Sequence, residues 1–379
     1  MRLASNAPSP QISVAILTMS DPERTFRGNM NNFIDLIRTG KEMGAFIYVA
    51  TIDDLKPERK RIYGYVHHPE SGMWIRQLLP LPQVIYSRIP NRKDEQQPEV
   101  QAVIRSILKK KSPALFNPYF FNKWTLYEWL DRSKATRRFI PATRKLSTPE
   151  DLAAFMGKHP TIYLKPIRGK AGTGIMKLEK GSKRDRFWCR LHLQEKEKSV
   201  TSKHYNLIQL WTQIKQETFG EEYIMQQGIP LARVDNRPFD LRVLVQKNGK
   251  GIWSLSGIGA RVAGRKSITT HVPRGGYIDS PENALISVFG EEKSPQLLKK
   301  VKKSSLYLAR HIERESGVPL GEMSMDLGVD SNGRIWFFEA NSRPMKFDEP
   351  EIRTKSLESI VNYCLYLGKS GVRNKVKST

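Results

Sequence analysis

The sequence is poor in cysteine, with only Cys189 and Cys364 among its 379 residues. Neither cysteine stands in a CxxC or Cys/His spacing, so a disulfide framework and a zinc site are both disfavoured and a reducing compartment is favoured. No apolar stretch approaches the roughly 20 residues that a membrane helix needs. The N-terminal segment also lacks the charged start and apolar run of a signal peptide. We therefore expect a cytoplasmic protein with no membrane partner.

Internal repeats and low-complexity blocks are absent too, and a composition of 39% hydrophobic and 27% charged residues is that of a globular protein. The chain is too long for one small core, so two or three lobes are expected. What it has in excess is positive charge, with a formal net charge of +25 at pH 7. Such a balance favours an anionic partner: an acidic polymer, nucleic acid, an anionic surface or ATP.

The predicted elements divide the chain into a parallel α/β start and an α+β remainder. Strands are predicted over 12–19, 46–50 and 84–86, with an amphipathic helix over 29–43 that Gly44 ends. This order predicts a small parallel lobe that ends near residue 115. The remainder has predicted strands at 161–164, 222–229, 239–247, 252–260, 322–329 and 335–341, and predicted helices at 121–131, 151–155, 207–217, 294–316 and 354–367. The highly charged segment 184–203 is predicted as a flexible excursion.

Glu339 and Asn341 stand two residues apart in an apolar run, IWFFEAN. Alternate residues of a strand share a face, so both oxygens point the same way. A four-residue hairpin loop over 331–334 would pair Asp326 of the preceding strand with Glu339, whereas a slip of one residue would separate them. Two carboxylates and an amide oxygen suit Mg²⁺. Taken alone, the Glu-x-Asn pair is equally compatible with a strand end.

A glycine-rich segment, KPIRGKAGTG, runs from Lys165 to Gly174 between two predicted strands. Glycines allow the backbone N–H groups to approach phosphate oxygens closely. The segment is neither a Walker A loop nor a GxGxxG turn into a helix. It predicts a hairpin over phosphates, with Lys165 on the entering strand, and an ordinary glycine turn is the alternative. The other residues expected to contact phosphates are Gly169, Lys170, Gly172, Thr173 and Gly174.

The third segment is EEYIMQQGIP, a predicted strand that enters a turn. Its backbone groups would be available to an adenine edge at Gln226, Gln227, Gly228 and Ile229. Asp240 and Arg242 share one face of the next strand, where contact with the nucleotide and an ion pair between them are equally compatible with the spacing.

These segments, in this order, resemble the ATP-grasp superfamily, and they are most similar to its YheC/YheD-like branch, the spore-coat-associated proteins of Gram-positive spore formers. The resemblance extends over nearly the whole chain and includes FRGN at 26–29, YSRIPNR at 86–92 and FNPYFFNKW at 116–124. It implies a small parallel α/β domain over 1–115, followed by two α+β subdomains that grip ATP. These are 116–225, with the glycine loop, and 226–379, with the magnesium site and the basic tail.

The resemblance also implies residue roles. Lys123 and Lys165 would contact ATP phosphates, the segment 226–229 would be the adenine-binding hinge, and Asp326, Glu339 and Asn341, followed by Pro344, match the metal pattern. In RVAGRKSITTHVPRGG, Arg261 and Gly275–Gly276 fit the superfamily, while His271 stands where Asn is usual.

The implied activity is that of an ATP-dependent carbon–nitrogen ligase that uses ATP and Mg²⁺ and forms an acyl-phosphate. We expect Arg261, Arg274 and Lys165 to act on the transferring phosphate or the substrate carboxylate, because a guanidinium binds either in a bidentate way. Arg27 and Arg88 face the cleft if the first lobe packs as the resemblance implies. The basic charge favours an acidic or peptide-like substrate.

The alternative is a non-catalytic ATP-grasp scaffold of the spore coat, or a protein that binds polyanions such as nucleic acid. Nucleic acid is the less favoured partner, because aromatic residues interleaved with basic ones are confined to 187–190. The filled metal and lysine positions argue against a scaffold. The resemblance places the protein in the mother-cell cytoplasm or the spore coat, where spore-coat proteins are possible partners.

Overall fold

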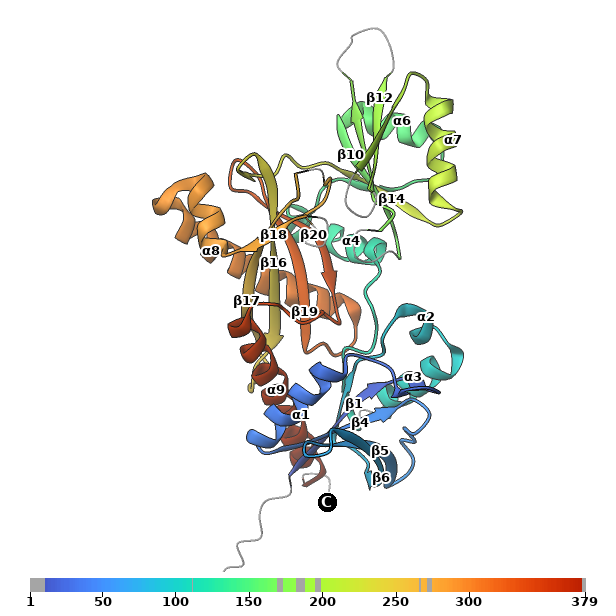
Figure 1. Ribbon diagram of the computed structural model, residues 1–379, viewed down its shortest axis with the longest axis vertical. Helices are drawn as coiled ribbons and strands as arrows, with labels where there is room; N and C mark the ends of the chain where they lie inside the picture. Colours follow the sequence, from blue (N-terminus) through green and yellow to red (C-terminus); the bar gives the residue numbers. More distant parts are fainter. Residues whose placement is uncertain are drawn as a thin grey trace, which may run out of the picture.

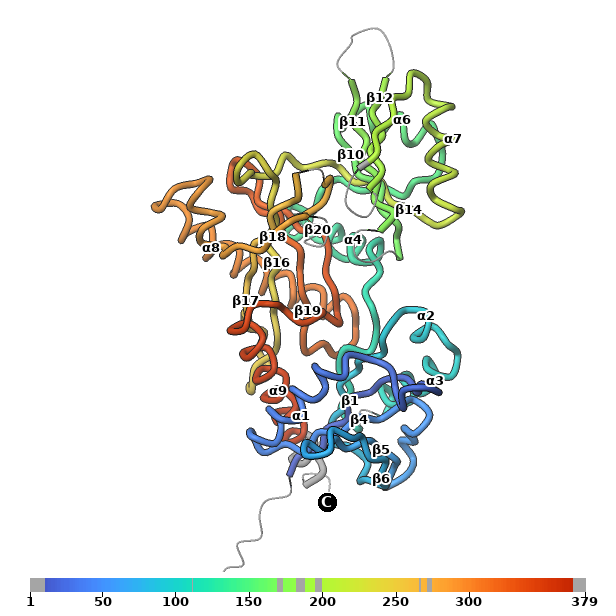
Figure 2. The backbone as a smooth tube through the Cα atoms, in the orientation of Figure 1, coloured from blue at the N-terminus to red at the C-terminus, as the bar shows by residue number. Residues whose placement is uncertain are grey.

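The computed structural model describes residues 11–110, 112–168, 173–181, 188–194, 199–265, 267–270 and 275–376 (Figure 1). These residues form three large sheets and a short hairpin of β2 (Ser20–Asp21) and β3 (Thr25–Phe26). Figures 1 and 2 show the first sheet at the bottom, the third in the middle and the second at the top. Some positions singled out in the sequence lie outside the described residues: Gly169, Lys170, Gly172, His271 and Arg274.

The first sheet has the strand order β6-β5-β4-β1-β7-β8. Its parallel strands are β1 (Ile12–Thr18), β4 (Ala45–Thr51), β7 (Val84–Ser87) and β8 (Ala114–Phe116). β1 and β4 are almost wholly buried, as expected of parallel strands covered on both faces. The predicted parallel lobe is confirmed. The antiparallel hairpin of β5 (Arg61–His68) and β6 (Met73–Pro80), which extends this sheet, was not predicted.

The helices of this lobe are α1 (Met30–Glu42), α2 (Arg92–Glu95) and α3 (Pro98–Lys110). The Asn29 side chain accepts a hydrogen bond from the backbone N–H of Asn32 and so begins α1. Gly44, at φ 81°, follows its end. The predicted helix over 29–43 is therefore confirmed, and the polar residues at its start explain its position.

The second sheet is antiparallel, with the order β13-β12-β11-β10-β14-β9. Its strands are β9 (Thr143–Lys145), β10 (Thr161–Pro166), β11 (Met176–Lys180), β12 (Cys189–Gln194), β13 (Ser199–His204) and β14 (Tyr223–Gln227). α6 (Pro149–Lys158) and α7 (Leu207–Thr218) share its core. The predicted excursion over 184–203 is wrong for β12 and β13, because Cys189 and Leu191 are buried in that core.

The third sheet has the order β18-β17-β16-β19-β20. These strands are β16 (Arg237–Lys247), β17 (Trp253–Val262), β18 (Tyr277–Asp279), β19 (Glu322–Val329) and β20 (Ile335–Asn341). The short strand β15 (Arg233–Val234) pairs with β16 alone. α8 (Pro281–Ser316) covers one face and shares its core with α4 (Lys123–Asp131), which α5 (Lys134–Arg137) follows. α8 begins earlier than predicted, and its kink lies at Gly290, where φ is 78°.

α9 (Pro350–Val376) connects the third sheet to the first, since Val361 and Cys364 lie in the same core as residues of β1 and β4. The three sheets use residues 12–116, 143–227 and 233–341, and the division into 1–115, 116–225 and 226–379 stays a proposal. Among the described residues, no helix is long and apolar enough to cross a membrane.

Candidate functional site

The hairpin of β19 and β20 places Asp326 opposite Glu339, as predicted, but by a different route. The turn pairs Val329 with Ile335, and counting from that pair alone would put Phe338 opposite Asp326. A β-bulge shifts the register by one residue just before this point. The extra residue, Phe338, therefore brings Glu339 opposite Asp326.

The bulge also decides which face of β20 carries the polar residues. Ile335, Phe337 and Ala340 all lie in the core under α8. The residues that face this core are therefore odd-numbered up to 337 and even-numbered at 340. Glu339 and Asn341 therefore point away from that core. In an uninterrupted strand Glu339 would share a face with Phe337 and would be directed into apolar surroundings.

The polar residues of the third sheet form rows that cross its strands. In one row Arg242, Asp326 and Glu339 are paired, and in the next Leu244, Ser324 and Asn341 are paired. Side chains directly opposite one another on neighbouring strands have Cβ atoms about 4.5–5.5 Å apart. The predicted metal-binding residues thus occupy two adjacent rows on one face.

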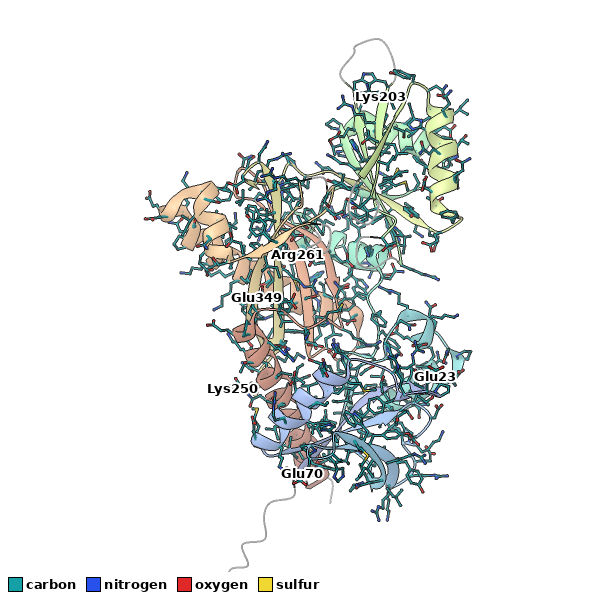
Figure 3. All side chains as sticks on the ribbon, in the orientation of Figure 1. Glu23, Glu70, Lys203, Lys250, Arg261 and Glu349 are labelled. Carbon is teal, nitrogen blue, oxygen red and sulfur yellow. The ribbon has the colours of Figure 1, made fainter. Side chains whose placement is uncertain are left out.

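Arg261 on β17, labelled in Figure 3, forms ion pairs with two carboxylates of this face. Its Nε and Nη2 donate to Asp240 at 2.8 and 2.7 Å, and Nη2 lies 2.9 Å from Asp326 Oδ2. The Thr270 hydroxyl donates to Asp240 at 2.5 Å. Burial raises the pKa of Asp240 against the opposing effect of Arg261. Burial also disfavours the charge of Arg261, yet the two carboxylates raise its pKa above the ordinary value. The guanidinium is therefore held in place and charged.

Asp240 and Arg242 share a face but do not form the ion pair left open by the sequence. Asp240 pairs with Arg261 instead. The Arg242 guanidinium lies 5.4 Å from the ring centroid of Phe347, in the segment after β20. Arg242 is half-buried beside Asp326, so it stays a candidate for contact with an anionic ligand.

The two predicted phosphate-binding lysines approach the same carboxylate from different elements. Lys123 is the first residue of α4, and its Nζ lies 3.1 Å from Glu339 Oε1. Lys165 on β10 lies over the ring of Phe338, with 5.5 Å from Nζ to the ring centroid. Burial lowers the pKa of Lys165 to about 8, with Glu339 opposing that effect and Lys123 adding to it. Cations from α4 and from the second sheet thus lie near Glu339.

Gln226 has a role that the sequence did not reveal. Its Oε1 accepts a hydrogen bond from Lys165 Nζ at 2.6 Å, and its Nε2 donates to the Thr143 hydroxyl at 3.1 Å. The buried amide therefore orients the Lys165 ammonium. In the sheet, Gln226 pairs with Tyr163, which lies two residues before Lys165 on the adjacent strand. Knowledge of this strand register would have predicted the contact between Gln226 and Lys165.

The predicted hinge offers fewer backbone donors than expected. The N–H groups of Gln227 and Gly228 donate to Ala142 and Thr161, both at 2.8 Å. The expectation that these two donors are available to adenine is therefore wrong for this arrangement. Ile229 continues the segment, and its carbonyl accepts from Leu231 at 2.9 Å. The role of 226–229 in adenine binding stays a prediction.

Thr173 and Gly174 are the described end of the glycine-rich loop. Thr173 is exposed, and Gly174 has a φ of 71°. A Cβ at Gly174 would lie 2.7 Å from the Tyr223 hydroxyl. This position therefore requires glycine for two reasons, conformation and space.

Two residues that the sequence left without a role fasten the ends of β19 and β20 to the first lobe. Asn117, at φ 52°, donates to the carbonyls of Glu322 and Ser342 and accepts from the N–H of Gly321 at 2.8 Å. Arg343 lies 2.8 Å from Glu95 and donates to the carbonyls of Ile89, Asn117 and Pro118. The two residues that follow Asn341 are therefore bound to the first lobe by hydrogen bonds and an ion pair.

The donor set fits Mg²⁺ in its chemistry. Asp326 and Glu339 supply carboxylate oxygens and Asn341 an amide oxygen, and Mg²⁺ takes its remaining ligands from water and phosphate. No cluster of three or more His, Cys, Asp and Glu side chains that could hold a metal occurs in the described ranges. A metal here would therefore need the amide of Asn341 or oxygens from a ligand.

Comparison with known proteins identifies the family of the chain. The model of the YheC/D-like ATP-grasp family matches residues 113–367. The endospore coat-associated protein YheD of Bacillus subtilis (strain 168) is 28% identical over 333 residues, which are 87% of this chain and 72% of YheD. The endospore coat-associated protein YheC of the same organism is 22% identical over 337 residues, 88% of this chain and 91% of YheC.

The fold also matches solved structures. D-alanyl-alanine synthetase A from Vibrio cholerae superimposes with a TM-score of 0.53 at 12% identity, over 96% of this chain and 99% of that one. At this identity the match shows the ATP-grasp fold and no more. With the family model covering more than half of the residues, the chain belongs to the YheC/D-like ATP-grasp family.

Proposed function

We propose that this protein is an ATP-dependent ligase that joins a carboxylate to an amine or a similar nucleophile through an acyl-phosphate. One observation carries the proposal: Asp326 and Glu339 face each other in the sheet while Arg261, Lys123 and Lys165 surround them. A magnesium–nucleotide complex needs carboxylates for the cation and cations for the phosphates, close together. ATP-grasp proteins are typically ATP-dependent ligases, which agrees with this arrangement.

In this proposal the binding residues divide by charge. Asp326, Glu339 and Asn341 would hold Mg²⁺, which supplies charge neutralisation at the phosphate oxygens when bound. Lys123 and Lys165 bind phosphate oxygens, and Gln226 holds the Lys165 ammonium in position. Thr173, Gly174 and the other glycine-loop residues would cover the phosphates, and the segment 226–229 would contact adenine.

The chemical step needs positioning and charge stabilisation rather than a protein nucleophile. A substrate carboxylate oxygen attacks the γ-phosphorus and ADP leaves. The amine then attacks the acyl carbon, phosphate leaves, and the amine gives up a proton. Arg261, fixed by Asp240 and Asp326, stabilises the negative charge that develops on the transferred group. Arg242 borders the same face, and Arg274 keeps its proposed role beside Arg261.

ADP formation with pooled amino acids and short peptides tests this function. We expect Mg²⁺-dependent turnover in the wild type and a loss of about 100-fold in Glu339→Gln, since the Mg²⁺ that stabilises charge at the reacting centre would lose a carboxylate ligand. Glu358→Gln, an exposed carboxylate on α9, is the matched control and should keep full turnover.

The alternative is a scaffold or polyanion-binding protein, which the net charge of +25 favours. It predicts binding to generic DNA that weakens steeply with salt and does not respond to nucleotide. That result, together with no ADP formation by the wild type, would replace the ligase proposal.

A further inference from the structure

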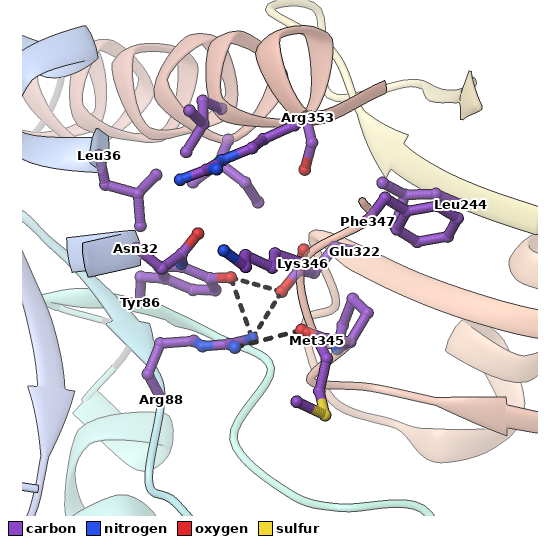
Figure 4. A pocket seen from close by; sticks show the side chains of 14 residues that line it. Asn32, Leu36, Tyr86, Arg88, Leu244, Glu322, Met345, Lys346, Phe347 and Arg353 are labelled. Atoms are coloured by element: carbon purple, nitrogen blue, oxygen red, sulfur yellow. Dashed lines mark hydrogen bonds and ion pairs between the residues drawn. The ribbon is translucent and has the colours of Figure 1, made fainter. Parts of the chain in front are cut away.

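A small recess lies where the first lobe meets the third sheet (Figure 4). It is bordered by Asn32 of α1, Arg88 after β7, Glu322 of β19, Lys346 after β20 and Arg353 of α9. Its volume is about 30 Å³. Because a bound water needs roughly 10–15 Å³ on this measure, the recess has room for about two waters or one carboxylate.

The wall of the recess is rigid and electrically neutral. Tyr86 donates to Glu322, and Arg88 Nη1 lies 3.2 Å from the same carboxylate. Arg88 Nη2 donates to the Pro344 carbonyl at 3.1 Å. Burial raises the pKa of Glu322, and Arg88 opposes that effect. The Glu322 charge is thus matched within the wall, and Arg88 serves to hold the wall together.

The mouth of the recess carries an excess positive charge. Arg353 forms an ion pair with Asp35 of α1. Lys346 is exposed and has no ion pair with any residue in the described part of the chain. Figure 4 shows the Lys346 amine, the Asn32 amide and the Arg353 guanidinium directed into the same space. These groups provide hydrogen-bond donors and one uncompensated charge, which together suit an anion.

The recess lies on the same sheet face as the candidate metal residues. Glu322, Ser324 and Asp326 alternate along β19, so all three point to that face. Ser324 is fully buried, and its hydroxyl has no hydrogen-bond partner among the described residues. At about 3.3 Å per residue, the recess lies roughly 7–13 Å along the strand from the row of Asp326 and Glu339.

We propose that this recess binds a second carboxylate of the substrate, and that the substrate is a short acidic peptide. This inference rests on the proposed ligase function, because it takes the first carboxylate to be the one activated beside Asp326 and Glu339. A separation of roughly 7–13 Å corresponds to two to four residues of extended peptide. Lys346 supplies the charge that selects the acidic residue, while Asn32 and Arg353 orient it.

Calorimetric titration of the full chain with acetylated triglutamate, without ATP, tests the inference. Acetylated triglutamine is the uncharged probe of the same size. We expect the wild type to prefer triglutamate, and Lys346→Met to weaken that binding about tenfold, the equivalent of one charge-assisted hydrogen bond. Lys346→Arg should keep most of the affinity. Lys355→Met removes an exposed lysine of α9 that does not line the recess, and should have little effect.

Two results would overturn the inference. One is equal binding of triglutamate and triglutamine by the wild type. The other is an equal loss in Lys346→Met and Lys355→Met, which would show a general effect of charge. Because the titration contains no ATP, it is separate from the test of the ligase function. If the protein shows no ATP turnover but binds triglutamate selectively through Lys346, the ligase proposal fails and the proposed carboxylate site stands.

Discussion

At the scale of single residues, the site brings together opposite charges, each of which would be unfavourable to bury without the other. Lys165 is the clearest case, because burial lowers the pKa of its ammonium to about 8 while Glu339 opposes that effect. Gln226 accepts from Lys165 Nζ but brings no charge. An anionic ligand beside Lys165 would favour the protonated form and so bind best when the lysine is charged.

The first prediction concerns pH. In the unfolded chain the lysine keeps its proton to about pH 10.4. Between pH 8 and that value the folded protein binds fewer protons, so its stability rises with pH, while its affinity for ATP falls. We expect the ATP affinity to drop by up to about tenfold per pH unit above pH 8. Calorimetry from pH 7 to 9.5 measures this, and Lys165→Arg should remove the slope. Identical profiles for the two proteins would refute it.

The second prediction concerns Arg261. Its Nε and Nη2 donate hydrogen bonds to the two carboxylate oxygens of Asp240, a geometry that a lysine does not reproduce. We expect Arg261→Lys to lower kcat by about 100-fold, as for loss of a charge-stabilising group, with a smaller change in the ATP dissociation constant. Steady-state ADP formation together with calorimetry separates the two. A loss of ATP affinity that matched the loss of kcat would assign Arg261 to ground-state binding.

At the scale of elements, the position of Glu339 depends on one bulge and two anchors. Phe338 is the extra residue that turns Glu339 and Asn341 away from the core. Asn117 and Arg343 then tie the strand ends to the first lobe. Because each of these polar groups is buried, removing one leaves several backbone groups without partners.

Asn117 provides the third prediction. Asn117→Gly keeps a residue that tolerates φ 52° but loses the side-chain hydrogen bonds. We expect it to lower the free energy of unfolding by about 2–4 kcal/mol. Asn117→Ala should lower it by roughly 1 kcal/mol more, because alanine is strained in the left-handed region. Urea unfolding measures both. A glycine variant as stable as the wild type would show that these bonds do not stabilise the anchor.

The sequence predicted the elements of this site better than the reasons for their arrangement. Alternation and turn residues were enough to predict β19, β20 and the pairing of Asp326 with Glu339. The assumed four-residue loop was wrong, since a bulge produces that register. The bulged residue, Phe338, lies against Lys165 of the second sheet, a contact that alternation along one strand does not predict. The roles of Asn117 and Arg343 likewise depend on contacts between residues more than 200 positions apart.

At the scale of the whole molecule, the candidate site lies between two sheets that few described polar contacts join. Tyr163 donates to the Ile268 carbonyl at 3.4 Å, and Gln194 Oε1 accepts from Ile268 N–H at 2.9 Å. The resemblance predicted the ATP-grasp fold, which the comparisons show. Composition and charge alone gave only a multi-lobed basic protein, because neither determines how lobes pack.

The fourth prediction follows from this arrangement. Mg–ATP, by contacting both sheets, should stabilise the folded chain; at a concentration of 100 times its dissociation constant the gain is about 2.7 kcal/mol. We expect the thermal midpoint to rise by several degrees in the wild type and to rise much less in Glu339→Gln at the same concentration of Mg–ATP. An equal rise in both proteins would place the nucleotide elsewhere.

The most direct test of the central claim is a calorimetric titration of ATP into the wild type and Glu339→Gln, each with and without Mg²⁺. The account predicts that Mg²⁺ tightens ATP binding to the wild type and that this gain disappears in Glu339→Gln, while Glu358→Gln retains it. Mg²⁺-independent ATP binding, or a gain that survives in Glu339→Gln, would contradict the claim that Asp326, Glu339 and Asn341 hold the metal.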